Sequence, residues 1–138
     1  MKAKGFSLIE LVFSVAIMGI LMAIMIPQFG RIRDQALEAS VKAVALSLQT
    51  AVETYAGENF IYPSQSYSEA DLASALIEDG IMTTLPKNPF TQQTYAASDQ
   101  AGKITYEPIS DGAGYTITAY KRDGATVLLT IQGGSSSS

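Results

Sequence analysis

The chain has 138 residues, with nine Lys and Arg against thirteen Asp and Glu, and it contains no histidine and no cysteine. Such a length provides for one small hydrophobic core, and the lack of cysteine excludes a disulfide framework. The acidic balance does not favour direct binding of nucleic acid. Without histidine, thiol, phosphate-binding loop or a nucleophile beside a base, we expect no enzyme and no catalytic, cofactor or metal site.

The first element is an apolar run of 20 residues from Leu11 to Gly30 without an ionisable side chain. As a helix it would extend about 30 Å, the thickness of the hydrocarbon core of a bilayer. One acid, Glu10, stands at its start. Because a charge at hydrocarbon depth costs at least ~2.5 kcal/mol, an isolated acid there predicts a functional role and a partner.

The residues before the run form a short basic segment, Met1 to Gly5. An ordinary secretory leader has its small-residue cleavage site after the apolar segment, whereas Gly5 precedes it. A cut after Gly5 would remove Lys2 and Lys4 and keep the apolar run, with Phe6 as the new amino terminus. Seven Lys and Arg would then face thirteen Asp and Glu, a side-chain charge of -6.

The sequence Gly5-Phe6-Ser7-Leu8-Ile9-Glu10-Leu11 and the run behind it resemble the prepilin signature of type IV pilins and type II secretion pseudopilins. The resemblance implies that a prepilin peptidase cuts between Gly5 and Phe6, that the Phe6 amine is methylated, and that inner-membrane assembly machinery polymerises the subunit into a helical filament. It also implies that Glu10 meets the Phe6 amine of a neighbouring subunit. The alternative reading of Glu10 is a snorkelling acid on an ordinary single-pass anchor.

The direction of insertion does not follow from charge, because Lys2 and Lys4 flank one end of the run and Arg31 and Arg33 the other. The resemblance places the N terminus in the cytoplasm. It implies an inner-membrane protein that later becomes part of an extracellular pilus on the cell surface.

The apolar run contains two residues that disfavour a regular helix, Gly19 and Pro27. Proline removes a backbone hydrogen bond, so we expect a kink or a local opening near the carbonyl of Ala23. The resemblance implies that the segment from Gly19 to Pro27 loses helical order in the filament, with Phe29 in the filament core. A mild fixed kink is the alternative.

Beyond the run the helical periodicity continues. Apolar residues recur at steps of four and three, which predicts an amphipathic helix that ends near Gly57. The stripe consists of Leu37, Val41, Val44, Leu48, Ala51 and Tyr55. We therefore divide the chain into a leader (residues 1–5), a transmembrane and filament-core helix (6–30), and an amphipathic helix with a globular head (31–138).

The sequence of the head predicts a short helix, a proline-rich loop and a sheet. Ser68-Glu69-Ala70-Asp71 is a capping pattern for a helix that ends at Gly80, and the loop lies at Leu85 to Phe90. Three strand-like segments follow, separated by Asp-Gly turn signals, namely Ile104 to Ile109, Tyr115 to Lys121 and Thr126 to Ile131. The expected fold is α+β, a long helix packed against a three-stranded antiparallel meander, which resembles the pilin fold.

The end of the sequence, Gly133-Gly134 and four serines, predicts a flexible tail, and a glycosylated patch is the alternative. The loop from Leu85 to Tyr95 resembles a segment of major pseudopilins that lies near a calcium site built partly from acidic C-terminal residues. This chain has no acidic cluster there, so we read its loop aspartates, Asp99, Asp111 and Asp123, as turn residues and expect no metal.

These observations favour a structural subunit of a type IV pilus, a homo-oligomeric filament that serves adhesion, twitching motility or DNA uptake. The closest alternative is the major pseudopilin of a type II secretion system. A third is a single-pass, membrane-tethered binding domain that never polymerises.

Overall fold

The computed structural model describes residues 4–134. The chain divides into two compact units, Met1–Gln35 and Ala36–Ser138, which are described separately. Helix α1, Leu8–Asn59, contributes to both units and contains Pro27 without a break in its helical assignment. An unbroken helix is what we expect of a subunit outside a filament, and the opening expected on assembly stays a prediction.

The end of α1 differs from the prediction. The helix does not stop at Gly57 but continues to Asn59, whose side-chain amide donates a hydrogen bond to the carbonyl of Tyr55. Phe60 then adopts a left-handed backbone with φ of 60°. A glycine inside the last turn only weakens a helix by about 1 kcal/mol, so the turn at Phe60 decides where it ends.

The short helix α2, Glu69–Glu78, confirms the capping pattern. Ser68 is the N-cap, and its hydroxyl oxygen accepts a hydrogen bond from the backbone N–H of Asp71 at 3.3 Å. At the other end Gly80 has φ of 74°, and its N–H donates to the carbonyl of Ile77. The left-handed glycine reverses the chain and satisfies a carbonyl that the helix leaves unpaired.

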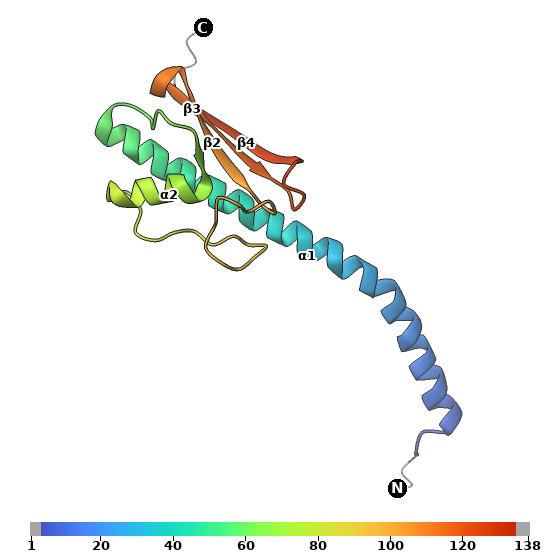
Figure 1. Cartoon of the computed structure of the whole chain (residues 1–138). Coiled ribbons are helices and arrows are strands. Elements are labelled where there is room, and N and C mark those ends of the chain that lie inside the picture. Colours follow the sequence, from blue (N-terminus) through green and yellow to red (C-terminus); the bar gives the residue numbers. More distant parts are fainter. Residues whose placement is uncertain (1–3, 135–138) are drawn as a thin grey trace. The chain divides into compact units, whose positions relative to one another are not determined.

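The sheet of the second unit has four antiparallel strands in the order β1-β2-β3-β4 (Figure 1). The predicted meander is present as β2 (Ile104–Ile109), β3 (Gly114–Tyr120) and β4 (Val127–Gly134). The fold class is confirmed. The additional strand β1, Tyr67–Ser68, pairs with β2, and two residues are too few to give an alternating pattern in the sequence.

The prediction of a flexible tail is wrong for its first two residues. Gly133 and Gly134 belong to β4 and pair with Tyr115 and Gly114 of β3, while the four serines lie outside the described residues. A Cβ atom at Gly133 would overlap the ring of Tyr115. Glycine is therefore required here for close packing rather than for flexibility.

The hydrophobic core of the second unit joins α1, α2 and the sheet. Val41, Leu48 and Ala51 of the predicted stripe are buried, and Ala45 and Val52 of α1 are buried beside them. The other three stripe residues, Leu37, Val44 and Tyr55, are half-buried. The core consists of Val41, Ala45, Leu48, Ala51, Val52, Leu72, Ala73, Leu76, Tyr95, Ile104, Tyr106, Tyr115, Ile117 and Ala119. One face of the sheet thus covers the amphipathic part of α1, as the sequence predicts.

Candidate assembly site

The start of α1 is fixed by a reciprocal contact between Ser7 and Glu10. The N–H of Ser7 donates to Oε2 of Glu10 at 2.9 Å, and the N–H of Glu10 donates to the Ser7 hydroxyl at 3.4 Å. This arrangement is a capping box, in which two unpaired N–H groups of a helix start are satisfied by side chains. Glu10 therefore has a local structural role before any contact with another subunit.

The capping box sets the conformation of the residues in front of the helix. Gly5 and Phe6 lie outside α1, which begins at Leu8, and the Phe6 side chain is 87% exposed. The bond between Gly5 and Phe6 is consequently in non-helical backbone. Because the Phe6 nitrogen is one residue from the Ser7 nitrogen that already contacts Glu10, an amine formed there would lie near this carboxylate.

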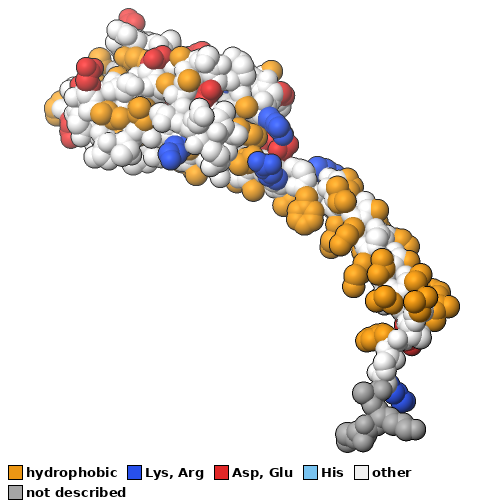
Figure 2. Space-filling view, turned by 60° about the horizontal axis from the view of Figure 1, so that its bottom comes forward, with side chains coloured by type: hydrophobic (Ala, Val, Ile, Leu, Met, Phe, Trp, Pro, Cys, Tyr) orange, Lys and Arg blue, Asp and Glu red, His pale blue; other side chains and the backbone are white. Residues whose placement is uncertain are grey.

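The N-terminal part of α1 presents apolar side chains around its whole circumference. Large apolar residues from Phe6 to Ile32 are between 54% and 87% exposed. Figure 2 shows orange side chains gathered along this part of the helix, whereas charged side chains appear on the surface of the second unit. Among the described helices, α1 alone is long and apolar enough to cross a membrane. An apolar surface of this extent requires lipid or protein as its surroundings.

The other predicted assembly residues lie further along the same helix. Phe29 lines a groove of about 310 Å³ together with four neighbours, namely Ile24, Met25, Gln28 and Ile32. Pro27 lies among these positions, and Gly19 is exposed with no atom near the place of its missing Cβ. At ~1.5 Å per residue, Pro27 is about 25 Å from Glu10.

The structure thus brings Ser7 and Glu10 together. It leaves Phe6 exposed before the helix, and Gly19, Pro27 and Phe29 are separate points along α1. Ser7 is the residue that the sequence analysis missed. Its signal was present, since Ser followed three residues later by Glu before an apolar run is the pattern of a capping box. The sequence analysis considered Glu10 only as an isolated charge, and it did not consider Glu10 as part of a helix cap.

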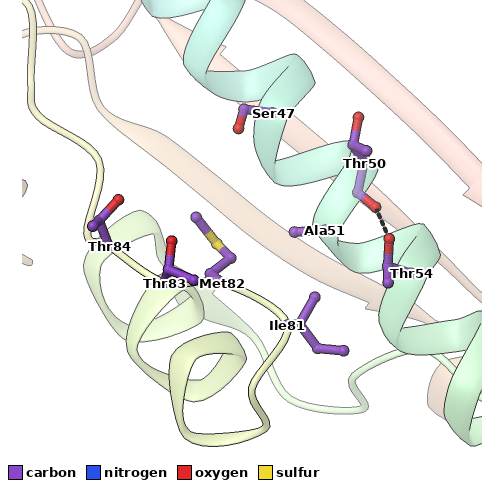
Figure 3. A pocket seen from close by; sticks show the side chains of 8 residues that line it. All are labelled: Ser47, Thr50, Ala51, Thr54, Ile81, Met82, Thr83 and Thr84. Atoms are coloured by element: carbon purple, nitrogen blue, oxygen red, sulfur yellow. Dashed lines mark hydrogen bonds between the residues drawn. The ribbon is translucent and has the colours of Figure 1, made fainter.

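The head contains a shallow groove of about 430 Å³ between α1 and the segment that follows α2. Figure 3 shows that Ser47, Thr50 and Thr54 come from α1 and that Ile81 to Thr84 come from the segment after α2. The Thr54 hydroxyl donates to the carbonyl of Thr50 at 2.9 Å. Ala51, Ile81, Met82, Thr83 and Thr84 complete the lining. No described lining residue is charged, so the groove offers hydrogen bonding and apolar contact without a general base.

The proline-rich loop is held by Asn88, which is fully buried. Its side-chain amide donates to Oδ2 of Asp99 and to the carbonyl of Ala101, both at 2.9 Å, and its oxygen accepts from the N–H of Phe90. Asp99 also accepts from the N–H of Ala96 at 3.2 Å. The Asp99 carboxylate is therefore used for packing the loop.

Glu69 is the unusual acid of the head. It is 2% exposed, and neither carboxylate oxygen has a hydrogen-bond partner within the described chain. Burial, and next the negative charge of Asp99, raise its pKa from 4.5 to about 8. Tyr95 and Lys103 line the same small cavity. A neutral carboxylic acid is the form of Glu69 that this site favours at pH 7.

Asp123 illustrates the contrasting, exposed case. Its carboxylate accepts hydrogen bonds from the hydroxyl and N–H of Thr126 and from the N–H of Ala125, and these bonds lower its pKa to about 2. It is a turn residue, as predicted. Within residues 4–134, no group of three or more acidic, histidine or cysteine side chains is arranged to hold a metal ion.

Comparison with known proteins agrees with this architecture of an exposed apolar helix and an α+β head. Residues 1–26 match the family described as "Prokaryotic N-terminal methylation motif". The chain is 49% identical over 51 residues to the type IV narrow pilus major component PilA5 of Thermus thermophilus, over 37% of this chain and 44% of that protein. No solved structure matches.

Two further relatives are matched over longer segments. The type IV major fimbrial protein FimA of Dichelobacter nodosus is 32% identical over 133 residues, which cover 91% of this chain and 76% of FimA. The type II secretion system core protein G of Pseudomonas aeruginosa is 34% identical over 87 residues, 63% of this chain and 58% of that protein. The chain spans less than two thirds of PilA5 and of protein G.

The fold and the exposed apolar helix define a pilin-like structural subunit. Because the similarity to FimA extends through most of both chains, this protein belongs to the type IV pilin and pseudopilin family. Its relatives are structural proteins rather than enzymes.

Proposed function

We propose that this chain is the structural subunit of a type IV pilus. A prepilin peptidase cuts between Gly5 and Phe6, the Phe6 amine is methylated, and the subunit passes from the inner membrane into an extracellular filament. Residues 6–30 form the filament core, and residues 31–138 form the outer layer, which serves adhesion, twitching motility or DNA uptake.

One observation carries the proposal, the apolar surface of α1. Its large side chains are more than half exposed on all sides from Phe6 to Ile32. Lipid can cover this surface before assembly, and identical helices can cover it afterwards. The similarity to FimA over 91% of the chain supports a pilus.

Within the filament, Glu10 pairs with the Phe6 amine of a neighbouring subunit. Oε2 of Glu10 accepts the hydrogen bond that caps α1. The same carboxylate therefore fixes the start of the helix and binds the amine of the neighbouring subunit. A buried carboxylate and ammonium must compensate each other where neither reaches water. The pair therefore sets the axial register of neighbouring subunits, with Gly19, Pro27 and Phe29 packing further along the core.

The capping box permits a test that separates charge from helix start. Glu10→Gln retains an acceptor for the Ser7 N–H and removes the charge, since glutamine also serves in a capping box. Ser7→Ala removes the hydroxyl acceptor, at a cost of about 1 kcal/mol, and retains the charge. We expect Glu10→Gln to be cleaved normally but to yield few sheared fibres, and Ser7→Ala to yield nearly as many as the unchanged chain.

Two outcomes would contradict the proposal. A normal fibre yield from Glu10→Gln would exclude the charge pair. N-terminal sequencing of the mature chain should give methylated Phe6, and a mature chain that begins at Met1 would exclude the processing step.

A second candidate is the major pseudopilin of a type II secretion system. The similarity to protein G over 63% of the chain favours it specifically. A pseudopilus subunit would form fibres outside the cell only on overproduction, whereas a pilin forms them at native expression. Electron microscopy of cells at native expression distinguishes the two.

A further inference from the structure

Strand β4 forms one edge of the sheet and is its longest strand. It has eight residues, and the strand at the opposite edge, β1, has two. Figure 1 places β4 at the margin of the sheet. About half of the backbone N–H and C=O groups of an edge strand point away from the sheet and have no partner in it. The sheet therefore has one edge long enough to bind a further strand.

The composition of β4 leaves this edge unprotected. Its sequence, Val-Leu-Leu-Thr-Ile-Gln-Gly-Gly, contains no charged residue and no proline. Proteins commonly protect an edge strand with Lys, Pro or a bulge. The only irregularity between β3 and β4 is a register shift at Ala119 and Tyr120, opposite the first residues of β4. The rest of the strand is regular.

The two faces of β4 are defined by the register with β3. Leu129 and Ile131 lie opposite the buried Ala119 and Ile117, so they are on the core side of the sheet. Thr130 lies opposite Thr118, on the outer side. Residues that face each other across two strands must lie on the same side of the sheet.

We infer that the edge of β4 binds β4 of a second copy of this chain, antiparallel, about a twofold axis through Thr130. The twofold axis is perpendicular to the sheet and lies midway between the two strands. Core-side residues then face core-side residues only if one residue lies directly opposite its own copy. Centring on Thr130 pairs Leu129 with Ile131, which both lie on the core side. Val127, opposite Tyr120 beyond the register shift, and Gly133, opposite Tyr115, lie on different sides of the sheet and are outside this pairing.

The chemistry of the strand identifies a second β4 as the occupant. A neutral strand opposite itself brings no like charges together, and it places two threonines in contact, a favourable cross-strand pair. The opposite edge of a second copy offers only the two residues of β1. The backbone groups of α1 and α2 are engaged within their helices.

The symmetry of this contact determines where it acts. A filament grows by repeating one head-to-tail contact, and a twofold contact is not repeated along such a filament. The β4 pair would then join heads that belong to two filaments and hold the filaments side by side. This consequence, unlike the contact itself, rests on the proposed pilus function.

Cross-linking tests the contact directly because the chain has no native cysteine. In the predicted pair the two Thr130 Cα atoms are about 4.5–5.5 Å apart, within disulfide range. The full chain carrying Thr130→Cys, oxidised in detergent micelles, should form a covalent dimer. Gln132→Cys tests the register, since its two copies would be about 14 Å apart along the strands. Thr118→Cys tests the edge, since its copies would be about 14 Å apart across the strands.

We expect the dimer band for Thr130→Cys and its loss for the two control variants. Equal dimer from Thr130→Cys and Gln132→Cys would mean unspecific contact and would overturn the inference, as would absence of dimer from Thr130→Cys. A second variant, Thr130→Lys, places like charges opposite each other. Electron microscopy should show separate fibres for Thr130→Lys. The unchanged chain and the control Thr118→Lys should show bundles of fibres. Absence of all fibres would contradict the pilus proposal, whereas single fibres from every variant would contradict the β4 contact.

Discussion

The phenol of Tyr115 donates a hydrogen bond of 2.7 Å to Oε1 of Glu53 and thereby connects strand β3 to helix α1. Tyr62 donates to Oε2 of the same carboxylate at 3.0 Å, and the rings of Tyr62 and Tyr115 lie 5.0 Å apart. One acid of the helix thus receives two phenols, one from β3 and one from the loop after α1. Burial, and next the bond to Glu53, raise the pKa of Tyr115.

Removing the Tyr115 hydroxyl should destabilise the head. In Tyr115→Phe the ring remains and the charge-assisted hydrogen bond is lost, so the free energy of unfolding should fall by about 1.5–3 kcal/mol. Urea denaturation of the full chain in detergent, followed by circular dichroism, measures this change. Tyr62→Phe is the control and should cost less, because its ring is more exposed. Equal losses would indicate that burial of the bond is unimportant.

The head should become less stable as pH rises from about pH 4.5 to 8, the two pKa values of Glu69. In this range the folded protein keeps the Glu69 proton and the unfolded chain loses it, so unfolding is favoured by rising pH. Each unit of pKa difference corresponds to about 1.4 kcal/mol. Asp99, Tyr95 and Lys103 are the titratable groups that share its cavity.

Melting temperatures at several pH values check this expectation. The unchanged chain should melt at lower temperature at pH 8 than at pH 5, and Glu69→Gln should largely remove the difference. Glu78→Gln, on the exposed part of α2, is the control and should behave like the unchanged chain. If the melting temperature of Glu69→Gln also fell between pH 5 and pH 8 by the same amount, the pH dependence would come from other titratable groups.

Asn88→Leu should destabilise the loop more than an average core substitution. The leucine has similar size but leaves the N–H of Phe90 and the carbonyl of Ala101 without their side-chain partner. Each buried group that loses its partner costs about 1–3 kcal/mol. Chemical denaturation measures the loss, and limited proteolysis should show earlier cleavage within residues 85–95. Unchanged stability would mean that water replaces both bonds.

Phe60→Gly should stabilise the head despite the loss of a large apolar side chain. Phe60 is 95% exposed and has φ of 60°, a conformation that glycine adopts without strain. Relief of this strain should raise the free energy of unfolding by roughly 1 kcal/mol. Phe60→Ala, which keeps the strain, is the control and should change little. A loss of stability in Phe60→Gly would show that the Phe60 ring has a packing role.

The sequence predicts the regular elements well where local signals and burial agree. Strand β2, Ile104–Ile109, has the predicted bounds because alternating side chains and the following Asp-Gly turn both specify it. The core residues Val41, Leu48 and Ala51 follow from helical periodicity. The fold class depends on these patterns, which require no knowledge of distant contacts.

The errors arise where tertiary packing overrides a local signal. Gly133 and Gly134 have the composition of a flexible tail, but the ring of Tyr115 and the pairing with β3 require glycine there. Gly57 has the appearance of a helix stop, yet α1 continues to Asn59. Glu69 belongs to a capping pattern in the sequence, and nothing in that pattern indicates its burial in the cavity that it shares with Asp99. Asp99 and Tyr115 are distant in sequence from the residues that they explain, whereas the turn at Phe60 lies only three residues after Gly57.

Pro27 gives the apolar helix a native spectroscopic reporter. Proline has no N–H, so the carbonyl of Ala23 lacks the donor that other carbonyls of the helix interior possess. Its stretching vibration should therefore be resolved from the main helix band when Ala23 carries an isotope-labelled carbonyl. The frequency of that single band would report whether the group meets lipid, protein or water, and it would follow the segment from membrane to filament without any change in sequence.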